Sequence, residues 1–260
     1  MKYALVHDQR SEAKPGLLGR CVSCGAGMVA KCGEKRVWHW AHHGKRQCDH
    51  WWESETEWHR SWKNRFPVKC QEVIHTAEDG AKHIADVETD QDWVIEFQHS
   101  YIKPEERRSR ESFYRNLVWV VNGLRRTNDL KQFIEAIRRG IQIFHKPLIL
   151  KIDPLKCRLM EEWSTSRVPV CFDFGDKFSP HALWLAVPMG LDDAAYFVLV
   201  GKEDFISWHC KGNFNPQPII NLIRKFEHYR VRAIKARYAS QLMPMLYKPG
   251  KRGTRGRKRL

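Results

Sequence analysis

The sequence contains no long hydrophobic run, and this absence excludes a membrane-spanning protein. None of its apolar stretches approaches the roughly 18 uninterrupted residues that a transmembrane helix needs. The chain begins with MKYALVHD, which lacks the long apolar segment of a secretory signal peptide. We therefore expect a cytoplasmic protein that does not insert into membranes.

Acidic residues are almost absent from the C-terminal segment. The whole chain has a formal net charge of +15, and residues 224–260 carry 13 lysines and arginines against one acid, Glu227. Apolar residues recur there at helical spacing, at Ile219, Leu222, Ile223, Phe226 and Tyr229. We expect an amphipathic helix and then a disordered basic tail that binds DNA phosphates through Lys251, Arg252, Arg255, Arg257, Lys258 and Arg259. A solubility tail or a contact with an anionic membrane is the alternative.

Disulfide bonds are not expected, because thiols stay reduced in the cytoplasm. The 8 cysteines instead show a spacing that is typical of a metal site, since C-x2-C is followed after 14 residues by H-x2-H. Unmetallated thiols beside core histidines are the alternative. We predict a structural zinc ion, with all four ligands from the protein. The predicted ligands are Cys21, Cys24, His39 and His42, and Cys32, His43, Cys48 and His50 are further candidates that leave the exact set open.

Acidic and amide side chains interrupt two stretches that otherwise read as β-strands. Residues 93–98 alternate like a strand that carries Glu96 and Gln98, residues 83–87 form a second strand that carries Asp86, and residues 88–91 read as the turn between them. Two carboxylates therefore meet on neighbouring strands. Burying both costs several kcal/mol unless a cation such as Mg2+ lies between them. The alternative is a hairpin whose acids face solvent.

The stretch 51–66 has helical periodicity, with four aromatic residues forming an apolar stripe. Glu55, His59 and Lys63 form a polar row beside this stripe, whereas Glu53 and Glu57 fall on the opposite, solvent side. We therefore expect Glu55 to face a site. An ordinary surface row of Glu, His and Lys is the alternative.

The predicted order of elements is helix, three strands, helix, strand, and the first of the three strands is an apolar stretch at 68–74. The second helix begins near Pro104, and as a crossover it would return the strand at 117–121 parallel to its partner, giving a mixed sheet. Arg107, Arg110 and Tyr114 share one face of this helix, where they could bind nucleic-acid phosphates. Equally, Arg110 could simply pair with Glu106.

The length of 260 residues and the 42% hydrophobic content predict an α/β protein with a substantial core. We divide the chain into a zinc-binding unit (1–50), a core (51–145), an accessory region (146–215), and a basic helix with its tail (216–260). The accessory region has β-leaning segments at 148–152, 168–174, 183–187 and 196–200, which suggest a small separate sheet. No chemical motif stands out in it, so we assign it no function.

Several of these motifs occur together in an order that resembles the competence protein CoiA-like family. They are the C-x2-C pair, HWAH, ETEWH with Lys63, ADV, IEFQ with Ser100, Arg110 with Tyr114, and VWV, which together cover residues 20–122. The family is regarded as a predicted nuclease of the PD-(D/E)xK, or restriction-endonuclease-like, superfamily. The resemblance implies that Asp86 and Glu96 are metal ligands, that Glu55 is a further acid of the site, and that Gln98 occupies the lysine position. The family's arginine before Ala-Asp-Val is here His83.

Phosphodiester hydrolysis agrees with these residue types, since it needs an activated water and a Lewis acid. Gln98 can orient water but cannot supply the charge of lysine, so His59, Lys63 or a second metal would have to compensate. We expect a Mg2+- or Mn2+-dependent deoxyribonuclease with structural zinc, acting in DNA uptake or recombination, alone or with proteins of those pathways. The alternative is a non-catalytic zinc-containing DNA-binding module built on a nuclease fold. The sequence leaves the strandedness of the substrate, the pathway and the oligomeric state open.

Overall fold

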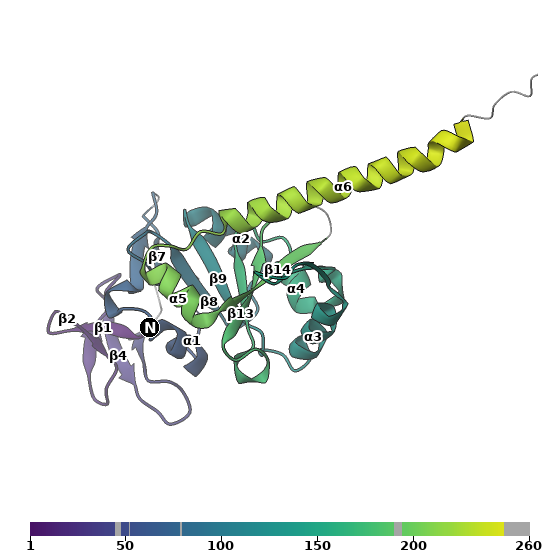
Figure 1. The fold of residues 1–260 in the computed structure, drawn as a ribbon. Coiled ribbons are helices and arrows are strands. Elements are labelled where there is room, and N and C mark those ends of the chain that lie inside the picture. The colour runs from purple at the N-terminus through teal and green to yellow at the C-terminus, as the bar shows by residue number, and fades with distance from the viewer. Residues whose placement is uncertain (45–47, 52, 79, 190–193, 247–260) are drawn as a thin grey trace, which may run out of the picture. The chain divides into compact units, whose positions relative to one another are not determined.

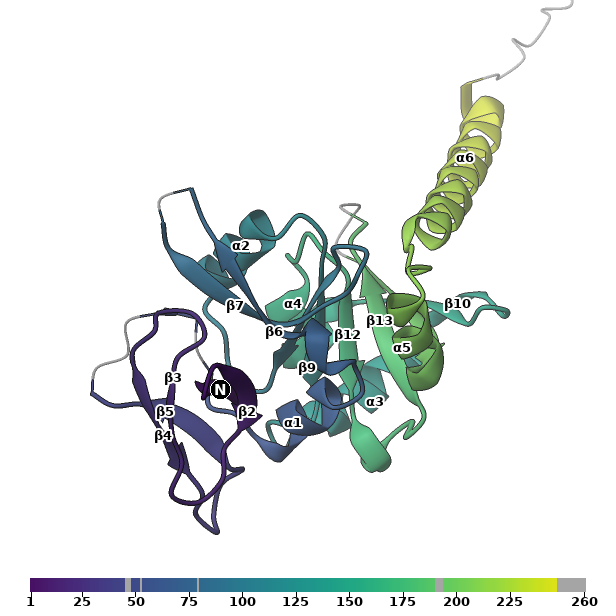
Figure 2. The same cartoon turned by 90° about the vertical axis from the view of Figure 1, so that its left-hand side faces the viewer.

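The structure, a computed structural model, describes residues 1–44, 48–51, 53–78, 80–189 and 194–246, with side chains as far as residue 240. It divides into two units, Met1–Pro216 and Gln217–Leu260. The first unit contains two sheets, which Figures 1 and 2 show side by side, and the second contains one long helix.

The smaller sheet is antiparallel and comes from the N-terminal segment. Its strand order is β2-β1-β3-β4-β5, and its core includes Met28, Trp40 and two cysteines, Cys21 and Cys48. Trp40 is almost fully buried and donates its indole N–H to the Ser11 carbonyl. The strands are β1 (Tyr3–Val6), β2 (Gln9–Glu12), β3 (Leu18–Arg20), β4 (Gly27–Lys31) and β5 (His39–His42).

The larger sheet is mixed, with nine strands in the order β10-β11-β14-β13-β12-β9-β8-β7-β6. Strands β8, β9 and β12 run parallel, and the other neighbouring pairs are antiparallel. The strands are β6 (Gln71–Thr76), β7 (Lys82–Glu88), β8 (Val94–Gln98), β9 (Leu117–Asn122), β10 (Ile141–Phe144), β11 (Ile149–Ile152), β12 (Val170–Asp173), β13 (Ala182–Val187) and β14 (Ala195–Gly201).

Helices cover both faces of the large sheet. Side chains of α3, α4 and the end of α2 join one core with Trp119 of β9, whereas Trp62 of α1 packs between Phe97 of β8 and Phe205 of α5. Both β8 and β9 are buried along their whole length, as expected for central parallel strands. The helices are α1 (Glu57–Lys63), α2 (Pro104–Phe113), α3 (Asp129–Arg139), α4 (Arg158–Trp163), α5 (Lys202–Cys210) and α6 (Gln217–Leu246).

The predicted order of helix, three strands, helix and strand is confirmed as α1-β6-β7-β8-α2-β9, with β9 parallel to β8. The prediction of a separate accessory sheet is wrong. The four predicted strands of that region are present as β11 to β14, but β12 pairs directly with β9, so they extend the same sheet. Sequence patterns report which face of a strand is apolar but not which strand is its neighbour, and this explains the error.

Asp173, at the end of β12, holds α1 against the sheet. Its Oδ2 accepts the indole N–H groups of Trp58 at 3.0 Å and Trp62 at 2.8 Å, and its Oδ1 lies 2.8 Å from the Lys202 ammonium. The carboxylate is buried and fully partnered, which a buried charge requires. The accessory region therefore fixes the helix that carries His59 and Lys63.

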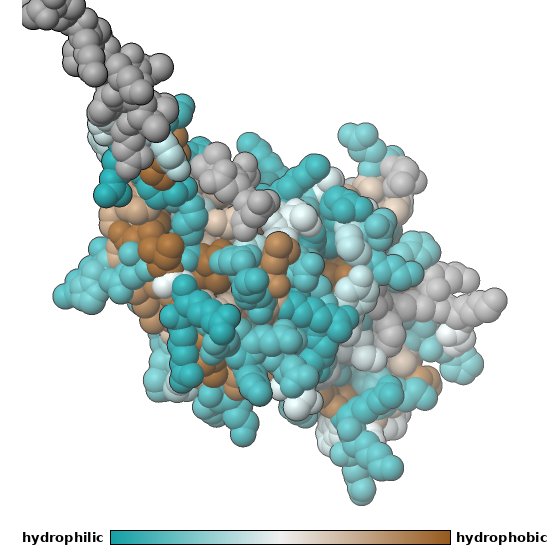
Figure 3. Space-filling view, turned by 90° about the vertical axis from the view of Figure 1, so that its right-hand side faces the viewer, coloured by the Kyte–Doolittle hydropathy of each residue, from teal (hydrophilic) through white to brown (hydrophobic). Residues whose placement is uncertain are grey.

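The second unit consists of α6 and the residues after it. Side chains from Val231 to Ser240 are exposed, including Tyr238, and Glu227 is the single acid of the helix and accepts from Arg230 at 2.7 Å. Among the described helices, none is long and apolar enough to cross a membrane. Figure 3 shows one side of the molecule, where hydrophobic residues form small areas within a mainly hydrophilic surface.

Candidate functional site: a cysteine–histidine cluster and an acidic pocket

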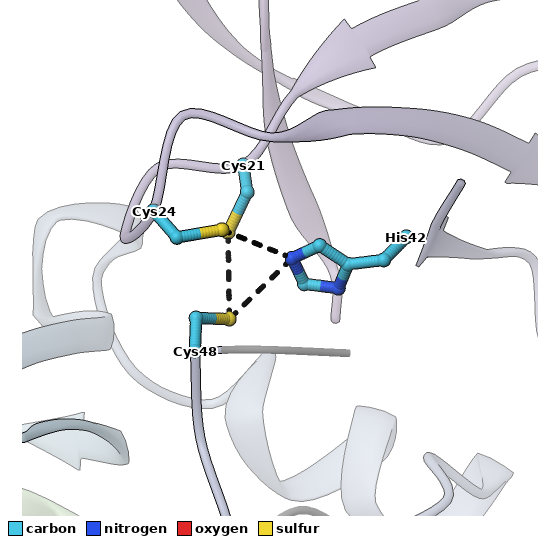
Figure 4. Close-up of side chains that lie close together, drawn as sticks. All are labelled: Cys21, Cys24, His42 and Cys48. Atoms are coloured by element: carbon cyan, nitrogen blue, oxygen red, sulfur yellow. Dashed lines mark hydrogen bonds between the residues drawn. The ribbon is translucent and has the colours of Figure 1, made fainter. Parts of the chain in front are cut away.

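Four side chains of the N-terminal segment converge on one point, as Figure 4 shows: Cys21, Cys24, His42 and Cys48. The Cys21 and Cys48 sulfurs are 3.7 Å apart, and His42 Nε2 lies 3.3 Å from the Cys24 sulfur and 3.4 Å from that of Cys48. A tetrahedral zinc ion with bonds of about 2.3 Å to sulfur and about 2.0 Å to nitrogen needs ligand atoms about 3.5–3.8 Å apart. The cluster could therefore hold a structural metal such as zinc.

The local backbone prepares the Cys21–Cys24 turn for this role. Gly25 adopts φ of 72° and its N–H donates to the Cys21 carbonyl, while the Ser23 N–H points at the Cys21 sulfur at 3.4 Å. A hydrogen bond from Cys48 and others from the Cys24 and Ser23 backbone outweigh burial and lower the pKa of Cys21 to about 4. A thiolate, the form that binds metals, is thereby favoured.

His39 does not belong to the cluster, so its prediction as a zinc ligand is wrong. Because His39 and His42 are three residues apart in strand β5, their side chains point to opposite faces. The His39 Nδ1 lies 2.8 Å from the Val37 carbonyl instead. Cys48, one of the further candidates, takes the fourth position.

A second cluster lies in a small cavity of about 60 Å³ where α1 and the loop before it meet β6, β7 and β8. Three neighbouring strands each contribute one acid. Gln71 and Val73 pair with Val87 and Ala85, so Glu72 lies between them, opposite Asp86. The six carboxylates that line the cavity are Asp49, Glu53, Glu55, Glu72, Asp86 and Glu96.

The strands β7 and β8 separate at Asp86, and the two predicted carboxylates occupy the opening. The backbone ladder ends at the Val87–Ile95 pair. Beyond it, Asp86 Oδ2 accepts the Phe97 N–H at 3.0 Å, and Glu96 Oε1 accepts the Asp86 N–H at 3.4 Å. Burial, followed by repulsion from Asp86, raises the pKa of Glu96 to about 8, although the Arg110 guanidinium at 2.9 Å opposes the rise.

Lys63 is the cation at the centre of the pocket. Its ammonium lies 3.0 Å from Asp86, 3.2 Å from Glu72 and 3.7 Å from Glu55. Burial disfavours its charged form, but Asp86, Glu55 and Glu72 together raise the pKa of Lys63 well above its ordinary value. The side chain therefore stays protonated at neutral pH.

Glu55 lines the pocket from the non-helical segment that precedes α1. The predicted helix over 51–66 is shorter, because Thr56 caps α1 and the residues before it are not helical. Glu55 pairs with Arg60 at 2.9 Å, and its buried Oε2 accepts no hydrogen bond from the residues that the structure describes. Burial alone would raise its pKa, but Lys63 and then Arg60 lower the pKa of Glu55 to about 2.

The same shortening overturns the prediction that Glu53 faces solvent, whereas Glu57 is exposed as predicted. Glu53 Oε2 lies 3.4 Å from His59 Nε2 and accepts the Gln98 amide N–H at 3.0 Å. Gln98 also donates to the Ser100 carbonyl at 3.1 Å, so it supports Glu53 and not Asp86. The cation beside Asp86 is Lys63 instead.

The predicted nucleic-acid face on α2 is not an accessible surface. Arg107 is 2% exposed, donates to the Glu162 carbonyl at 2.6 Å and lies over the Trp163 ring. Arg110 pairs with Glu96 and Glu106, the alternative that its spacing had left open, and Tyr114 is buried beyond the end of the helix. The tail residues 251–259 lie outside the described part of the chain.

Sequence reasoning missed Asp49 and Glu72 as members of the pocket. Glu72 lies in a stretch, 68–74, that read as an apolar strand. An acidic residue within an apolar strand is the pattern that identified Glu96. The same pattern also identifies Glu72. Asp49 lies in a loop, where periodicity gives no such signal.

No family model, curated protein or solved structure matches the chain.

The first prediction concerns the fourth metal ligand. Purified protein should contain about one zinc ion per chain, which Cys48→Ser should remove and His39→Ala should retain, because only Cys48 adjoins the other ligands. Elemental analysis of untagged protein measures this. Zinc lost from the His39 variant but kept by the Cys48 variant would contradict the ligand set.

The second prediction follows from the raised pKa of Glu96, about 8 against an ordinary 4.5. The protonated carboxyl contributes stability that is fully present below about pH 4.5 and is lost as the pH rises through 8. In buffer without Mg2+ or Mn2+, the stability of Glu96→Gln relative to the wild type should therefore rise by roughly a few kcal/mol between pH 5 and pH 8. Urea unfolding at each pH measures the difference, with the exposed Glu105→Gln as control. Parallel pH profiles for the wild type and Glu96→Gln would contradict it.

Proposed function

We propose that this protein is a divalent-metal-dependent nuclease that hydrolyses phosphodiester bonds in DNA. The observation that carries the proposal is the meeting of Asp86 and Glu96 across separated strands, with Lys63 beside them and Glu55 at the same cavity. Oxygen donors crowded in this way favour a hard divalent cation such as Mg2+ or Mn2+.

The order of elements supports a restriction-endonuclease-like core of the CoiA-like kind. Strands β6, β7 and β8 form an antiparallel meander after α1, and α2 crosses over to β9, parallel to β8. The acids of the pocket come from this part of the chain and from the segment before α1. The remaining strands extend the sheet away from the pocket.

Three observations on the residues themselves support a metal here. Glu55 keeps one buried oxygen that accepts no hydrogen bond from the described residues, burial and then repulsion from Asp86 raise the pKa of Glu96 to about 8, and the three proposed ligands are all carboxylates. Asp86, Glu96 and Glu55 would hold the ion. When bound, it would polarise the phosphate and lower the pKa of a water molecule.

Lys63 supplies the positive charge that Gln98 cannot. Its ammonium stays protonated beside Asp86, so it can donate to a phosphate oxygen and stabilise the charge that develops there, but it cannot act as a base. His59 lies at the same cavity, where Glu53 and Thr56 orient its ring by contacts of 3.4 and 2.9 Å. It can donate a proton to the leaving oxygen.

The cavity is too small to hold a nucleotide, so the DNA backbone would bind at its opening. Helix α6 carries several exposed cations, Arg232, Lys235 and Arg237, together with the exposed Tyr229 and Tyr238. Cations with interleaved aromatic side chains are typical of nucleic-acid binding. We assign the electrostatic contacts with DNA to α6 and the basic tail, in place of Arg107, Arg110 and Tyr114.

One observation favours the second candidate, a DNA-binding module without catalysis. The Lys63 ammonium already lies 3.0 Å from Asp86, and the Arg110 guanidinium lies 2.9 Å from Glu96. A site that has lost its metal would keep such ion pairs. Cleavage assays separate the two candidates.

The third prediction is that Asp86→Ala and Glu96→Ala each reduce Mg2+- or Mn2+-dependent cleavage at least about 100-fold, because each removes a metal ligand. DNA affinity should stay within about twofold, since it is assigned to the cations of α6 and the basic tail. Circular single-stranded and linear duplex DNA are the substrates. The exposed acid of the same hairpin provides the control Asp90→Ala, which should cleave normally. A wild-type protein that cleaves neither substrate would favour the binding module.

The fourth prediction concerns α6. Replacing Arg232, Lys235 and Arg237 by Gln should weaken DNA binding and reduce the slope of log K against log salt by about 2–3, because each phosphate contact contributes about 0.9. Fluorescence anisotropy at several salt concentrations measures this. Replacing three exposed lysines of the first unit, Lys14, Lys177 and Lys211, is the matched control. An equal loss of slope in both triple variants would show a nonspecific charge effect and not a surface on α6.

A further inference from the structure

The cysteine–histidine cluster is tied to strand β7 through the residue that follows Cys48. The Asp49 carboxylate is 7% exposed, and its Oδ2 accepts the Ile84 N–H at 3.3 Å. Its Oδ1 accepts the Trp51 N–H at 2.9 Å and lies 3.4 Å from His83 Nδ1. One side chain therefore shapes the loop after Cys48 and binds this loop to the sheet.

Two further contacts link the same segments. The Trp51 ring stacks on His83, with centroids 3.4 Å apart and planes inclined by 10°. The Lys82 ammonium donates to the carbonyl of Ser23, between Cys21 and Cys24, at 2.8 Å. Three consecutive residues of β7 thus contact the two loops that carry the cysteines.

These contacts lie in the part of β7 that is not paired with β8. The backbone ladder with β8 ends at Val87, so Ile84 lies beyond it, and the Asp49 carboxylate accepts its N–H. Ile84 and Asp86 point to the same face of β7, and both line the acidic pocket. The Ile84 side chain also packs against the core that contains Cys21 and Cys48. A shift of the loop at 48–51 would therefore move the strand that carries Asp86.

We propose that Asp49 is a positioning residue through which metal binding at Cys21, Cys24, His42 and Cys48 fixes Asp86 in the acidic pocket. The metal ion binds Cys48 and thereby fixes the position of the next residue, Asp49. The Asp49 carboxylate in turn fixes β7 through its hydrogen bond with the Ile84 N–H. Loss of the metal frees the loop and loosens the pocket. The consequence for cleavage rests on the proposed function, whereas the consequence for the mobility of β7 does not.

Hydrogen–deuterium exchange of the full-length, zinc-loaded protein tests the link. Asp49→Ala should exchange about 3- to 10-fold faster over residues 82–88, as expected for the loss of one hydrogen bond, while its zinc content and the exchange of β13 stay unchanged. Removing zinc from the wild type should produce the same increase. Asp153→Ala is the matched control, because Asp153 accepts the N–H two residues ahead, as Asp49 does, but lies at an exposed turn.

A second readout separates positioning from general stability. Asp49→Ala should need several-fold more Mn2+ for half-maximal cleavage yet approach the wild-type rate at saturation, since the ligands are displaced and not removed. If Asp49→Ala fails to fold, Asp49→Asn replaces it and should give an intermediate exchange rate, because its amide oxygen keeps one acceptor.

Unchanged exchange over 82–88 in zinc-bound Asp49→Ala, or in the zinc-free wild type, would overturn the proposal. A wild type that cleaves no DNA would overturn the proposed function instead. The exchange experiment would still decide the role of Asp49.

Discussion

The Lys63 ammonium lies within 3.7 Å of carboxylates from three separate parts of the chain: Glu55 before α1, Glu72 on β6 and Asp86 on β7. Buried acids repel one another, and removing one partner of a buried ion pair typically costs about 3–5 kcal/mol. Lys63 and Arg110 offset this repulsion and allow the acids to stay together. A divalent ion would relieve the same crowding, so the pocket is organised for positive charge whether or not a metal is bound.

The rest of the fold holds Lys63 and these acids in register. Asp173 binds two tryptophans of α1, which fixes the helix that carries Lys63, and this gives the accessory region a structural role that its sequence did not reveal. At the start of the N-terminal sheet, the backbone N–H groups of Lys2 and Tyr3 donate to the Glu72 carboxylate at 2.6 and 3.0 Å. The N-terminal sheet and the far strands of the large sheet therefore both act on one small cavity.

Much of this arrangement could be predicted from local patterns. Alternation placed Asp86 and Glu96 on neighbouring strands, and Pro104 marked the crossover helix. Two of the errors come from a spacing that was read on the wrong secondary-structure element. Glu53 and Glu55 were read on a helix that begins only after Thr56, and His39 was paired with His42 although they lie in a strand. Contacts between distant segments, such as β12 with β9 or Asp49 with Ile84, follow from tertiary packing that spacing does not encode.

We propose that the pocket around Asp86 binds a divalent cation. Anomalous scattering from crystals of the zinc-loaded protein soaked in Mn2+ tests it most directly, because the two metals have different absorption edges. We predict a Mn2+ peak at Asp86 and Glu96, with the Lys63 ammonium displaced from Asp86, and a separate zinc peak among the cysteines. A pocket without Mn2+, in which Lys63 and Arg110 keep their ion pairs, would contradict the claim.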